Sequence, residues 1–401
     1  MASKSIEQIV MLPFMAHGHL IPFLALARQI HQATGFKISI ASTPLNIQYL
    51  SSTFNSSPYE PENDHIHLLE LPFCSGAYGT LAYSSLWLNL PHRGRSDSDE
   101  FHLPGFPDSC RFHINQLHHF LRNADGTDSR SQFFQSQISL SMQSFGWLCN
   151  TAEEFEPAGL EWLRNFVKLP VWAIGPLLPP IVLKNDYSSL SVAASGISTR
   201  RSGKRLEISI EKCMEWLESH SPASVLYISF GSQNSISPSQ MMELAIGLEE
   251  SAKPFIWVSG LLNWAPQLEI LSHKSTGAFL SHCGWNSVLE SLSQAVPIIG
   301  WPLAAEQAYN SKMLVEEMGV SVELTRGVQS SIDWKVVKNV IELVMDKKGK
   351  GGDMRSKAMV IKEQLRASVR DEGEDKGSSV KALDDLIKTL QSKWQMISSI
   401  S

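Results

Sequence analysis

The sequence has few of the features that mark several large classes of protein. Its 401 residues include only five cysteines, which are scattered and form no CxxC pair, so neither a disulfide framework nor a zinc site is expected. No stretch reaches the roughly 18 apolar residues of a membrane span. Lys and Arg number 34 against 40 Asp and Glu, which leaves no basic surplus for nucleic acid. These absences favour a reducing compartment, and we expect a cytoplasmic monomer.

The N-terminus also lacks a clear secretion signal. Residues Ile9–Phe14 are apolar and follow Lys4, but Ala16–His19 interrupts the run and no small-residue cleavage site follows. We therefore expect no signal peptide. What the chain does have is 43% hydrophobic residues, enough for sizeable cores, in a length that suits two or three domains.

Alternating strand and helix patterns predict an α/β fold. Ile9–Phe14 is typical of a buried strand, and Phe36–Ala41 of a second one. Between them a turn is expected at His17–Pro22 and a helix at Phe23–Gln32, which together make a βαβ unit of a parallel sheet. Other elements predicted in this half are strands at Ile66–Leu71, Phe145–Asn150 and Val171–Ile174, and helices at Leu117–Leu121 and Ser131–Ser141.

A second α/β region follows Ser188–Arg205, a stretch rich in Ser, Gly and basic residues that is typical of a linker. Beyond it, strands are predicted at Val225–Phe230, Phe255–Val258 and Thr276–Ser281, and helices at Ile210–His220, Ser237–Glu250, Trp334–Met345, Met354–Val369 and Lys376–Lys393. We expect a first domain at 1–180, a linker at 181–205, a second domain at 206–375, and a C-terminal helix at 376–401 that packs back on the first domain. Ligands of such sheets bind at the carboxyl ends of the strands, here in a cleft between the domains.

The most informative segment is the 44 residues Trp264–Gln307, in which polar residues alternate with short apolar runs. His282–Ser287 lies between a strand and a helix, and Gly284 permits a tight turn there. The backbone N–H groups that begin this helix make a diphosphate site without any Lys or Arg. Ser287 suits the N-cap. Because Ser287 and Glu290 also fit a capping box, both could instead serve only the helix.

Two side-chain types in this segment have ordinary alternatives. Trp264, taken alone, is either a core residue or an aromatic platform for a ligand. His282 and Cys283, with His273 nearby, could suggest metal ligands, but no further His or Cys completes a set. We therefore expect no metal.

The segment resembles the donor-binding signature of the plant family-1 UDP-glycosyltransferases, which also spans 44 residues from its opening Trp to its closing Gln. The resemblance implies two Rossmann-like parallel-sheet domains of the GT-B type facing across a cleft. It also implies UDP-glucose as co-substrate, a small hydroxylated acceptor such as a phenolic or flavonoid, and no cofactor. Family members bind the donor at positions that match Ser232, Trp264, Ala265, Gln267, His282, Trp285, Asn286, Ser287, Glu290, Glu306 and Gln307.

The resemblance assigns the base and the ribose to four of these positions. Trp264 stacks on uracil, the Ala265 backbone reads the edge of the base, and Gln267 and Glu290 reach the ribose. The positions assigned to the phosphates are His282, Asn286, Ser287 and Ser232, the last in a Gly231-Ser232 turn that is otherwise a plain turn.

The same resemblance assigns the sugar hydroxyls to Glu306 and Gln307, which could otherwise be ordinary residues of a helix surface. Gln307 at the last position, together with Trp285, implies glucose. Ala295 replaces the glycine usual in the family, and we expect its methyl group to tighten the packing there.

Glycosyl transfer with inversion also needs a base for the acceptor hydroxyl, and His19 is the candidate. It follows the first strand, in a loop where a His taken alone is more often without a catalytic role; within the resemblance His19, not His17, is the base. The carboxylate that orients such a His should follow a buried strand. None of the aspartates before Asn150 does, since all lie in polar stretches: Asp64, Asp97, Asp99, Asp108, Asp125 and Asp128.

The resemblance covers nearly the whole chain and implies two internal deletions, so that the first domain is shortened. At Phe73-Cys74 a third-strand region joins a helix that lies far downstream in the family, and at least two strand–helix units are missing. At Ser259–Leu261 a strand runs almost directly into the tail of another. Parallel neighbours need a crossover of about a dozen residues, so either the strands rearrange or the second domain is locally broken.

Three functions remain. The first is a UDP-glycosyltransferase acting on a small apolar plant metabolite. The alternative is a catalytically impaired splice or gene-model variant that binds UDP-sugar without turnover, because the orienting aspartate and the crossovers are missing. A nucleotide-sugar epimerase with the same two domains is the third, and the 44-residue signature argues against it.

Overall fold

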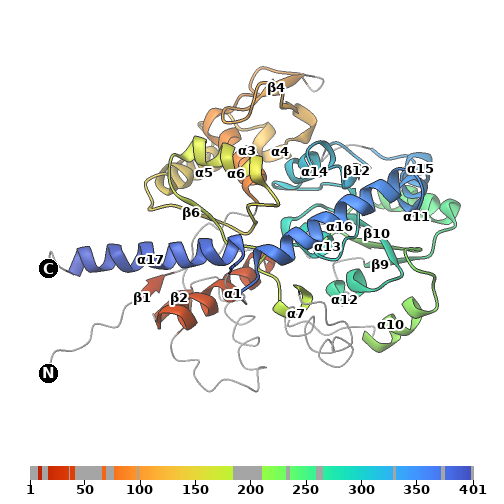
Figure 1. The fold of residues 1–401 in the computed structure, drawn as a ribbon. Helices are drawn as coiled ribbons and strands as arrows, with labels where there is room; N and C mark the ends of the chain where they lie inside the picture. Colours follow the sequence, from red (N-terminus) through yellow and green to blue (C-terminus); the bar gives the residue numbers. More distant parts are fainter. Residues whose placement is uncertain are drawn as a thin grey trace.

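The structure is a computed structural model of the 401-residue chain. It describes residues 8–10, 17–35, 37–40, 66–68, 76–96, 99–183, 210–231, 235–258, 265–327, 331–371 and 375–398. Helices alternate with parallel strands on both sides of the predicted linker (Figure 1). Most of the linker itself lies outside the described residues. No helix in the described ranges is long and apolar enough to cross a bilayer.

A three-stranded parallel sheet begins the described chain. Its strands, in spatial order, are β1 (Gln8–Val10), β2 (Lys37–Ile40) and β3 (Ile66–Leu68). Helix α1 (His17–Thr34) connects β1 to β2, and its Leu26 and Ile30 pack with Ile38 of β2 in one buried cluster. The predicted βαβ unit is therefore confirmed.

The turn predicted at His17–Pro22 is wrong, because α1 already begins at His17. Gly18 and Pro22 suggested a turn since both are poor residues for the interior of a helix. The packing of α1 against β2 outweighs that local preference. As a result, His19 is the third residue of a helix and does not belong to a loop.

The middle of the chain combines helices with two short strand pairs. The elements in order are α3 (Ala77–Asn89), the antiparallel strands β4 (Glu100–His102) and β5 (Arg111–His113), the 3-10 turn η2 (Ile114–Gln116), α4 (His119–Arg122), α5 (Ser129–Ser141), β6 (Trp147–Cys149), α6 (Pro157–Val167), β7 (Val171–Ala173) and α7 (Pro180–Leu183). β6 and β7 pair in parallel. The β4–β5 pair was not predicted, because strands of three residues are too short to show a period of two.

The second region is a five-stranded parallel sheet with the order β12-β11-β10-β8-β9. Its strands are β8 (Val225–Ser229), β9 (Phe255–Val258), β10 (Thr276–Ser281), β11 (Ile298–Gly300) and β12 (Ser321–Glu323). Every residue of β8, β10 and β11 is buried, as expected for strands covered on both faces.

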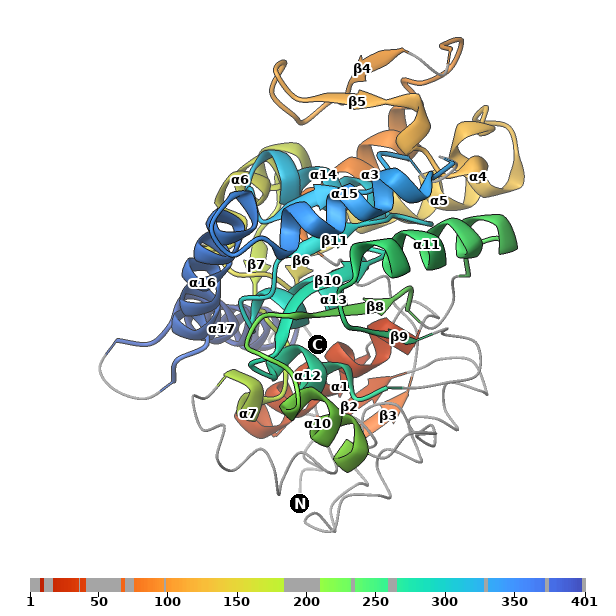
Figure 2. The same ribbon diagram turned by 90° about the vertical axis from the view of Figure 1, so that its right-hand side faces the viewer.

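Helices cover both faces of this sheet (Figure 2). They are α10 (Ile210–Glu218), α11 (Pro238–Ser251), α12 (Gln267–Ser272), α13 (Trp285–Leu292), α14 (Gln307–Glu316), α15 (Trp334–Met345) and α16 (Lys350–Ser368). Successive residues of β8 point to opposite faces. Leu226 packs with α11 and α15, whereas Tyr227 packs with α10 and α12.

Strand β9 pairs with β8 on one side and lies at the end of the strand order. The next described strand along the chain, β10, pairs in parallel with the other side of β8, and α12 lies between β9 and β10 in the chain. The strand tail predicted at Leu261–Trp264 lies outside the described residues.

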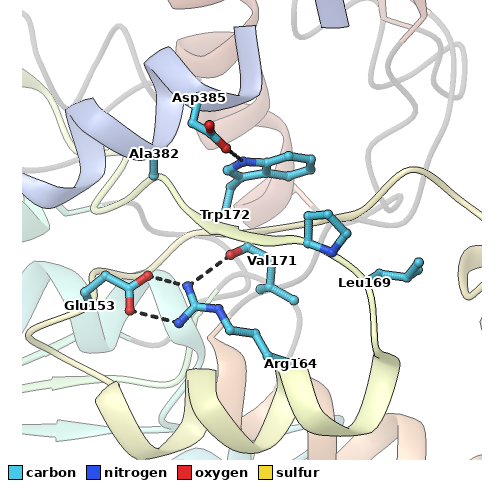
Figure 3. A pocket seen from close by; sticks show the side chains of 8 residues that line it. Glu153, Arg164, Leu169, Val171, Trp172, Ala382 and Asp385 are labelled. Atoms are coloured by element: carbon cyan, nitrogen blue, oxygen red, sulfur yellow. Dashed lines mark hydrogen bonds and ion pairs between the residues drawn. The ribbon is translucent and has the colours of Figure 1, made fainter. Parts of the chain in front are cut away.

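Helix α17 (Ser378–Ser398) carries the chain back to the first region, where it packs on β7 and α1 (Figure 1). Leu386 of α17 joins the buried cluster of Ile38 and Trp172. The Trp172 Nε1 group donates a hydrogen bond to Asp385 Oδ2 at 2.8 Å (Figure 3). The two regions are thus connected by packing as well as by the chain.

Ala295 follows α13 with a φ of +60°, in the left-handed region. Its N–H bonds to the Leu292 carbonyl at 3.0 Å, and the Val296 N–H bonds to that of Ser291 at 3.1 Å, so this backbone conformation is what ends the helix. The glycine usual in the family therefore suits the backbone, and alanine brings backbone strain here. The Ala295 side chain is 6% exposed and lies in a buried hydrophobic cluster, so the packing that we expected of its methyl group stays a prediction.

Replacing Ala295 by glycine should stabilise the protein by about 0.5–1 kcal/mol, because glycine adopts a positive φ without the cost that a Cβ brings. The free energy of unfolding in urea measures this. The matched control is Ala245→Gly, in the exposed middle of α11, which should cost about 1 kcal/mol. If both changes destabilise the protein equally, Ala295 is not strained.

Candidate functional site

The polar residues of the donor segment gather where β10 passes into α13. β10 ends at Ser281, Cys283 takes a φ of +62°, and α13 begins directly after Gly284. The first hydrogen bond inside the helix runs from the Val288 N–H to the Gly284 carbonyl at 3.1 Å. The N–H groups of residues 285–287 therefore have no acceptor inside the helix, which is the arrangement that binds anions.

The predicted helix start is wrong by three residues. The N-cap is Gly284, in an extended conformation, and not Ser287, which is the third residue of the helix. The capping-box alternative fails for the same reason. Ser287 and Glu290 bond instead to Gln267, whose Nε2 donates to Ser287 Oγ at 3.1 Å and to Glu290 Oε2 at 2.7 Å. Both side chains therefore belong to a hydrogen-bonded cluster of polar side chains that includes Gln267, and they do not cap the helix.

The same polar cluster includes a residue of the sheet, Tyr227 of β8. Gln267, at the start of α12, accepts a hydrogen bond from Tyr227 of β8 at 3.2 Å, so its amide is oriented by three side chains. Burial raises the pKa of Tyr227, which keeps this hydroxyl a donor. Ala265, just before α12, is partly buried against the hydrophobic cluster that contains Tyr227. A carboxylate and an amide side by side suit a ligand with hydroxyl groups.

His282 is 9% exposed and lies against two glycines. A Cβ on Gly231 would be 2.8 Å from its Nε2, and a Cβ on Gly284 would be 2.4 Å away, so both positions need glycine to admit the ring. Burial lowers the pKa of His282 to about 4, and the backbone of Ser229 offsets this only in part. His282 is therefore neutral at neutral pH. Its buried Nδ1 has no hydrogen-bond partner in the described part of the protein.

His273 does not join His282 and Cys283 in a metal site. It pairs with Glu218 at 3.2 Å instead. Across the described ranges, no three His, Cys, Asp or Glu side chains are grouped so that they could hold a metal ion.

Glu306 and Gln307 lie at the start of α14. Gln307 Oε1 accepts hydrogen bonds from the N–H groups of Leu303 and Ala304, both at 2.9 Å, so its Nε2 is the end left for a ligand. Burial raises the pKa of Glu306. This end of α14 packs closely on α3 of the first region, where a Cβ on Gly79 would be 2.5 Å from Asn310 Oδ1.

Trp285 connects the two regions. Its side chain is 3% exposed, and its Nε1 donates to the Asn150 carbonyl at 2.7 Å. A Cβ on Gly76 would be 2.6 Å from its ring, and the ring of Phe155 lies 5.6 Å away. The structure thus places this side chain between the two regions, whereas its neighbours Asn286 and Ser287 stay partly exposed.

Other predicted site residues fall outside what the structure describes. Ser232 and Trp264 lie outside the described residues, and for His19 only the backbone is described, in the first turn of α1. Their roles stay predictions.

The described aspartates of the first region all serve local structure. Asp99 accepts from the Ser96 N–H, Asp125 from Thr127, and Asp128 caps α5, while Asp108 faces His102 at 3.7 Å. Asp64 and Asp97 lie outside the described residues.

The buried carboxylate Glu156 was not singled out from the sequence. It is 2% exposed and accepts hydrogen bonds at 3.0 Å from the N–H groups of Ala77 and Tyr78, at the start of α3. Burial raises its pKa. Its partners are nearly 80 residues away, and nothing local distinguishes it from Glu153 and Glu154.

A hollow of about 420 Å³ lies beside Trp172 (Figure 3). Its polar groups already pair with one another: Arg164 bonds to Glu153 and to the Val171 carbonyl, and Trp172 bonds to Asp385. None of the predicted site residues lines it. It is therefore not the candidate site.

The burial of His282 predicts how stability depends on pH. A base with a lowered folded pKa contributes stability above its unfolded pKa of about 6.5, and this stability is lost as the pH falls through about 4. Between about pH 7.5 and pH 4.5, wild type should lose about 2–3 kcal/mol of unfolding free energy that a His282→Gln variant does not lose. Urea unfolding of both proteins at the two pH values measures this. An unchanged difference between them would show that His282 titrates normally.

Comparisons with known proteins point to one family. A family model described as UDP-glucoronosyl and UDP-glucosyl transferase matches residues 202–359. The chain is 37% identical to crocetin glucosyltransferase 3 of Crocus sativus, over 86% of this chain and 92% of that protein. It is 35% identical to UDP-glycosyltransferase 92A1 of Arabidopsis thaliana, over 95% of this chain and 96% of that protein.

Solved structures confirm the predicted fold of two Rossmann-like domains of the GT-B type. Glycyrrhiza uralensis UGT73P12, complexed with glycyrrhetinic acid 3-O-monoglucuronide, matches with a TM-score of 0.78 at 23% identity, over 98% of each chain. Medicago truncatula UGT71G1, complexed with UDP-glucose, matches with a TM-score of 0.73 at 22% identity, over 96% of this chain and 98% of that one.

The alignment with the Arabidopsis protein also shows that this chain is shorter within the matched region. It has 491 positions but takes in 95% of the 401 residues, about 381, so about 110 positions hold residues of the relative alone. Internal deletions, as the sequence implied, have this effect. With identities above 30% over most of both chains, the protein belongs to the UDP-glycosyltransferase family.

Proposed function

We propose that the protein is an inverting glycosyltransferase that moves glucose from UDP-glucose to a hydroxyl of a small, apolar plant metabolite such as a phenolic or flavonoid. The observation that carries this proposal is the first turn of α13, whose N–H groups have no helical acceptor and lie beside the buried, neutral His282.

In this proposal the diphosphate of the donor lies on the first turn of α13. The positive end of the helix dipole and the N–H groups of residues 285–287 balance its charge, so the proposal includes no metal or other cofactor. His282, Asn286 and Ser287 add side-chain contacts to the phosphates. A neutral imidazole can donate one hydrogen bond without first taking up a proton.

The ribose lies against Glu290 and Gln267, and the uracil against Trp264 and the Ala265 backbone. A carboxylate accepts hydrogen bonds from two neighbouring hydroxyls, and the 2.7 Å bond from Gln267 holds the Glu290 carboxylate in place for this role. Ser232, which follows β8 in the sequence, completes the phosphate contacts.

The sugar lies at the start of α14, where Glu306 accepts hydrogen bonds from its hydroxyls and the Gln307 Nε2 group donates to them. Glucose is favoured by Gln307 and by the relatives. The Crocus sativus protein is named for glucose transfer to crocetin, and the Medicago truncatula structure holds UDP-glucose.

The reaction is a single displacement with His19 as the base. The acceptor hydroxyl gives its proton to His19 while its oxygen bonds to the anomeric carbon, on the face opposite the diphosphate. The bond from that carbon to the phosphate oxygen breaks, and UDP leaves with the electron pair, stabilised by α13. The described aspartates of the first region contact residues close to them in the sequence, and we propose a slow enzyme without an orienting aspartate.

The proposed setting is a monomer in the cytoplasm, where the free cysteines of this chain stay reduced. A panel of phenolic acceptors with UDP-glucose tests the function, with UDP release and glycoside mass as readouts. We expect glucoside formation, and less product with UDP-galactose or UDP-glucuronate. UDP binding by calorimetry without any turnover would contradict the proposal and leave the alternative of a donor-binding protein.

Replacing His19 by Ala should reduce turnover by about 100-fold or more, because proton transfer by a positioned base contributes about that much. The dissociation constant for UDP should stay within a few-fold of wild type, since His19 touches the acceptor and not the nucleotide. The matched control is His17→Ala, which should retain turnover. If both variants lose it equally, or if His19→Ala loses UDP binding, His19 has a structural role.

A further inference from the structure

Asn150 follows β6 in the first region and contacts the first two residues of α13 in the second. It is 1% exposed. Its backbone carbonyl accepts the Trp285 Nε1 hydrogen bond at 2.7 Å, and its Nδ2 faces Asn286 Oδ1 at 3.5 Å. Its own Oδ1 accepts the Leu177 N–H at 2.8 Å. Each polar group of this side chain therefore has a defined neighbour.

The orientation of the Asn150 amide is fixed by the Leu177 N–H, which can only donate. The amide oxygen must face Leu177, so the NH₂ group must face Asn286. An NH₂ group also only donates, and it therefore favours the arrangement in which Asn286 turns its oxygen toward it. At 3.5 Å this contact is long, and its effect is on orientation, since the reversed Asn286 amide would set two NH₂ groups against each other.

The orientation of the Asn286 oxygen also determines where the Asn286 NH₂ group points. With its oxygen turned to Asn150, Asn286 directs its NH₂ group away from Asn150. In the proposed site Asn286 contacts the phosphates, whose oxygens only accept hydrogen bonds. An amide oxygen in that place would repel them.

We infer that Asn150 is a positioning residue of the donor site. The Leu177 N–H fixes the orientation of the Asn150 amide, and Asn150 in turn fixes that of the Asn286 amide. The Asn286 NH₂ group, a hydrogen-bond donor, then faces the diphosphate. This inference rests on the proposed function, because it concerns the UDP site. It makes donor binding by the second region depend on a residue of the first.

The variant Asn150→Asp isolates this effect. It keeps the shape of the side chain and the oxygen that accepts the Leu177 N–H, but replaces the NH₂ group by a second oxygen. The Asn286 amide should then reverse and turn its oxygen to the phosphates. The added negative charge also weakens UDP binding by itself. The same change in an Asn286→Ala background measures the charge effect alone, because no amide is left to reverse.

The experiment is calorimetric titration of the full chain with UDP for wild type, Asn150→Asp, Asn286→Ala and the double variant. We expect Asn150→Asp to raise the dissociation constant at least about tenfold more in wild type than in the Asn286→Ala background, as couplings between contacting residues commonly do. This excess should persist at high salt, which screens the charge effect. Melting temperatures identify variants that fail to fold.

Equal fold-changes in the two backgrounds would overturn the inference while leaving the UDP site intact. If wild type itself binds no UDP, the proposed function fails, and the inference fails with it. If Asn150→Asp does not fold, Asn150→Ala replaces it in the cycle. Its loss of UDP affinity should likewise vanish when Asn286 is absent, and a loss that stays the same would contradict the inference.

Discussion

The first turn of helix α13 is the feature on which the proposed donor site depends. Its N–H groups have no acceptors inside the helix, as in the first turn of any α-helix. The chain enters this turn from β10 through Cys283, at a φ of +62°, and through Gly284, which admits the His282 ring. Asn310 of α14 donates to the Cys283 carbonyl at 3.0 Å. This bond ties the turn to the helix that begins with Glu306 and Gln307, so the phosphate end and the sugar end of the site are held together.

The same turn is also held from the first region, by the Trp285 bond to Asn150 and by the close packing against Gly76. Glu156 fixes the start of α3 on that side. In the alignment with the relative from Arabidopsis thaliana, about 110 positions hold no residue of this chain, yet these contacts are all present. A shortened first domain is therefore compatible with the contacts that hold the proposed donor site. In the proposed reaction, the shortening affects the support of the proposed base, His19, and hence the rate.

The sequence was most informative where a pattern is long or is bounded on both sides. The strand at Thr276–Ser281 and the helix at Trp334–Met345 match the structure residue for residue. The predicted start of α13 does not match the structure, because the helix begins at the extended backbone of Gly284 and no side chain there signals a cap. The contact between Asn150 and Trp285 joins residues 135 positions apart, and no local pattern carries such information.

A crystal structure of the protein with UDP tests the central assignment most directly. The diphosphate should lie on the first turn of α13, within hydrogen-bond distance of the N–H groups of residues 285–287, with the Asn286 amide turning its nitrogen to the phosphates and its oxygen to Asn150. Glu290 should contact the ribose. A diphosphate bound elsewhere, for instance in the hollow beside Trp172, would contradict the assignment of the donor site to α13.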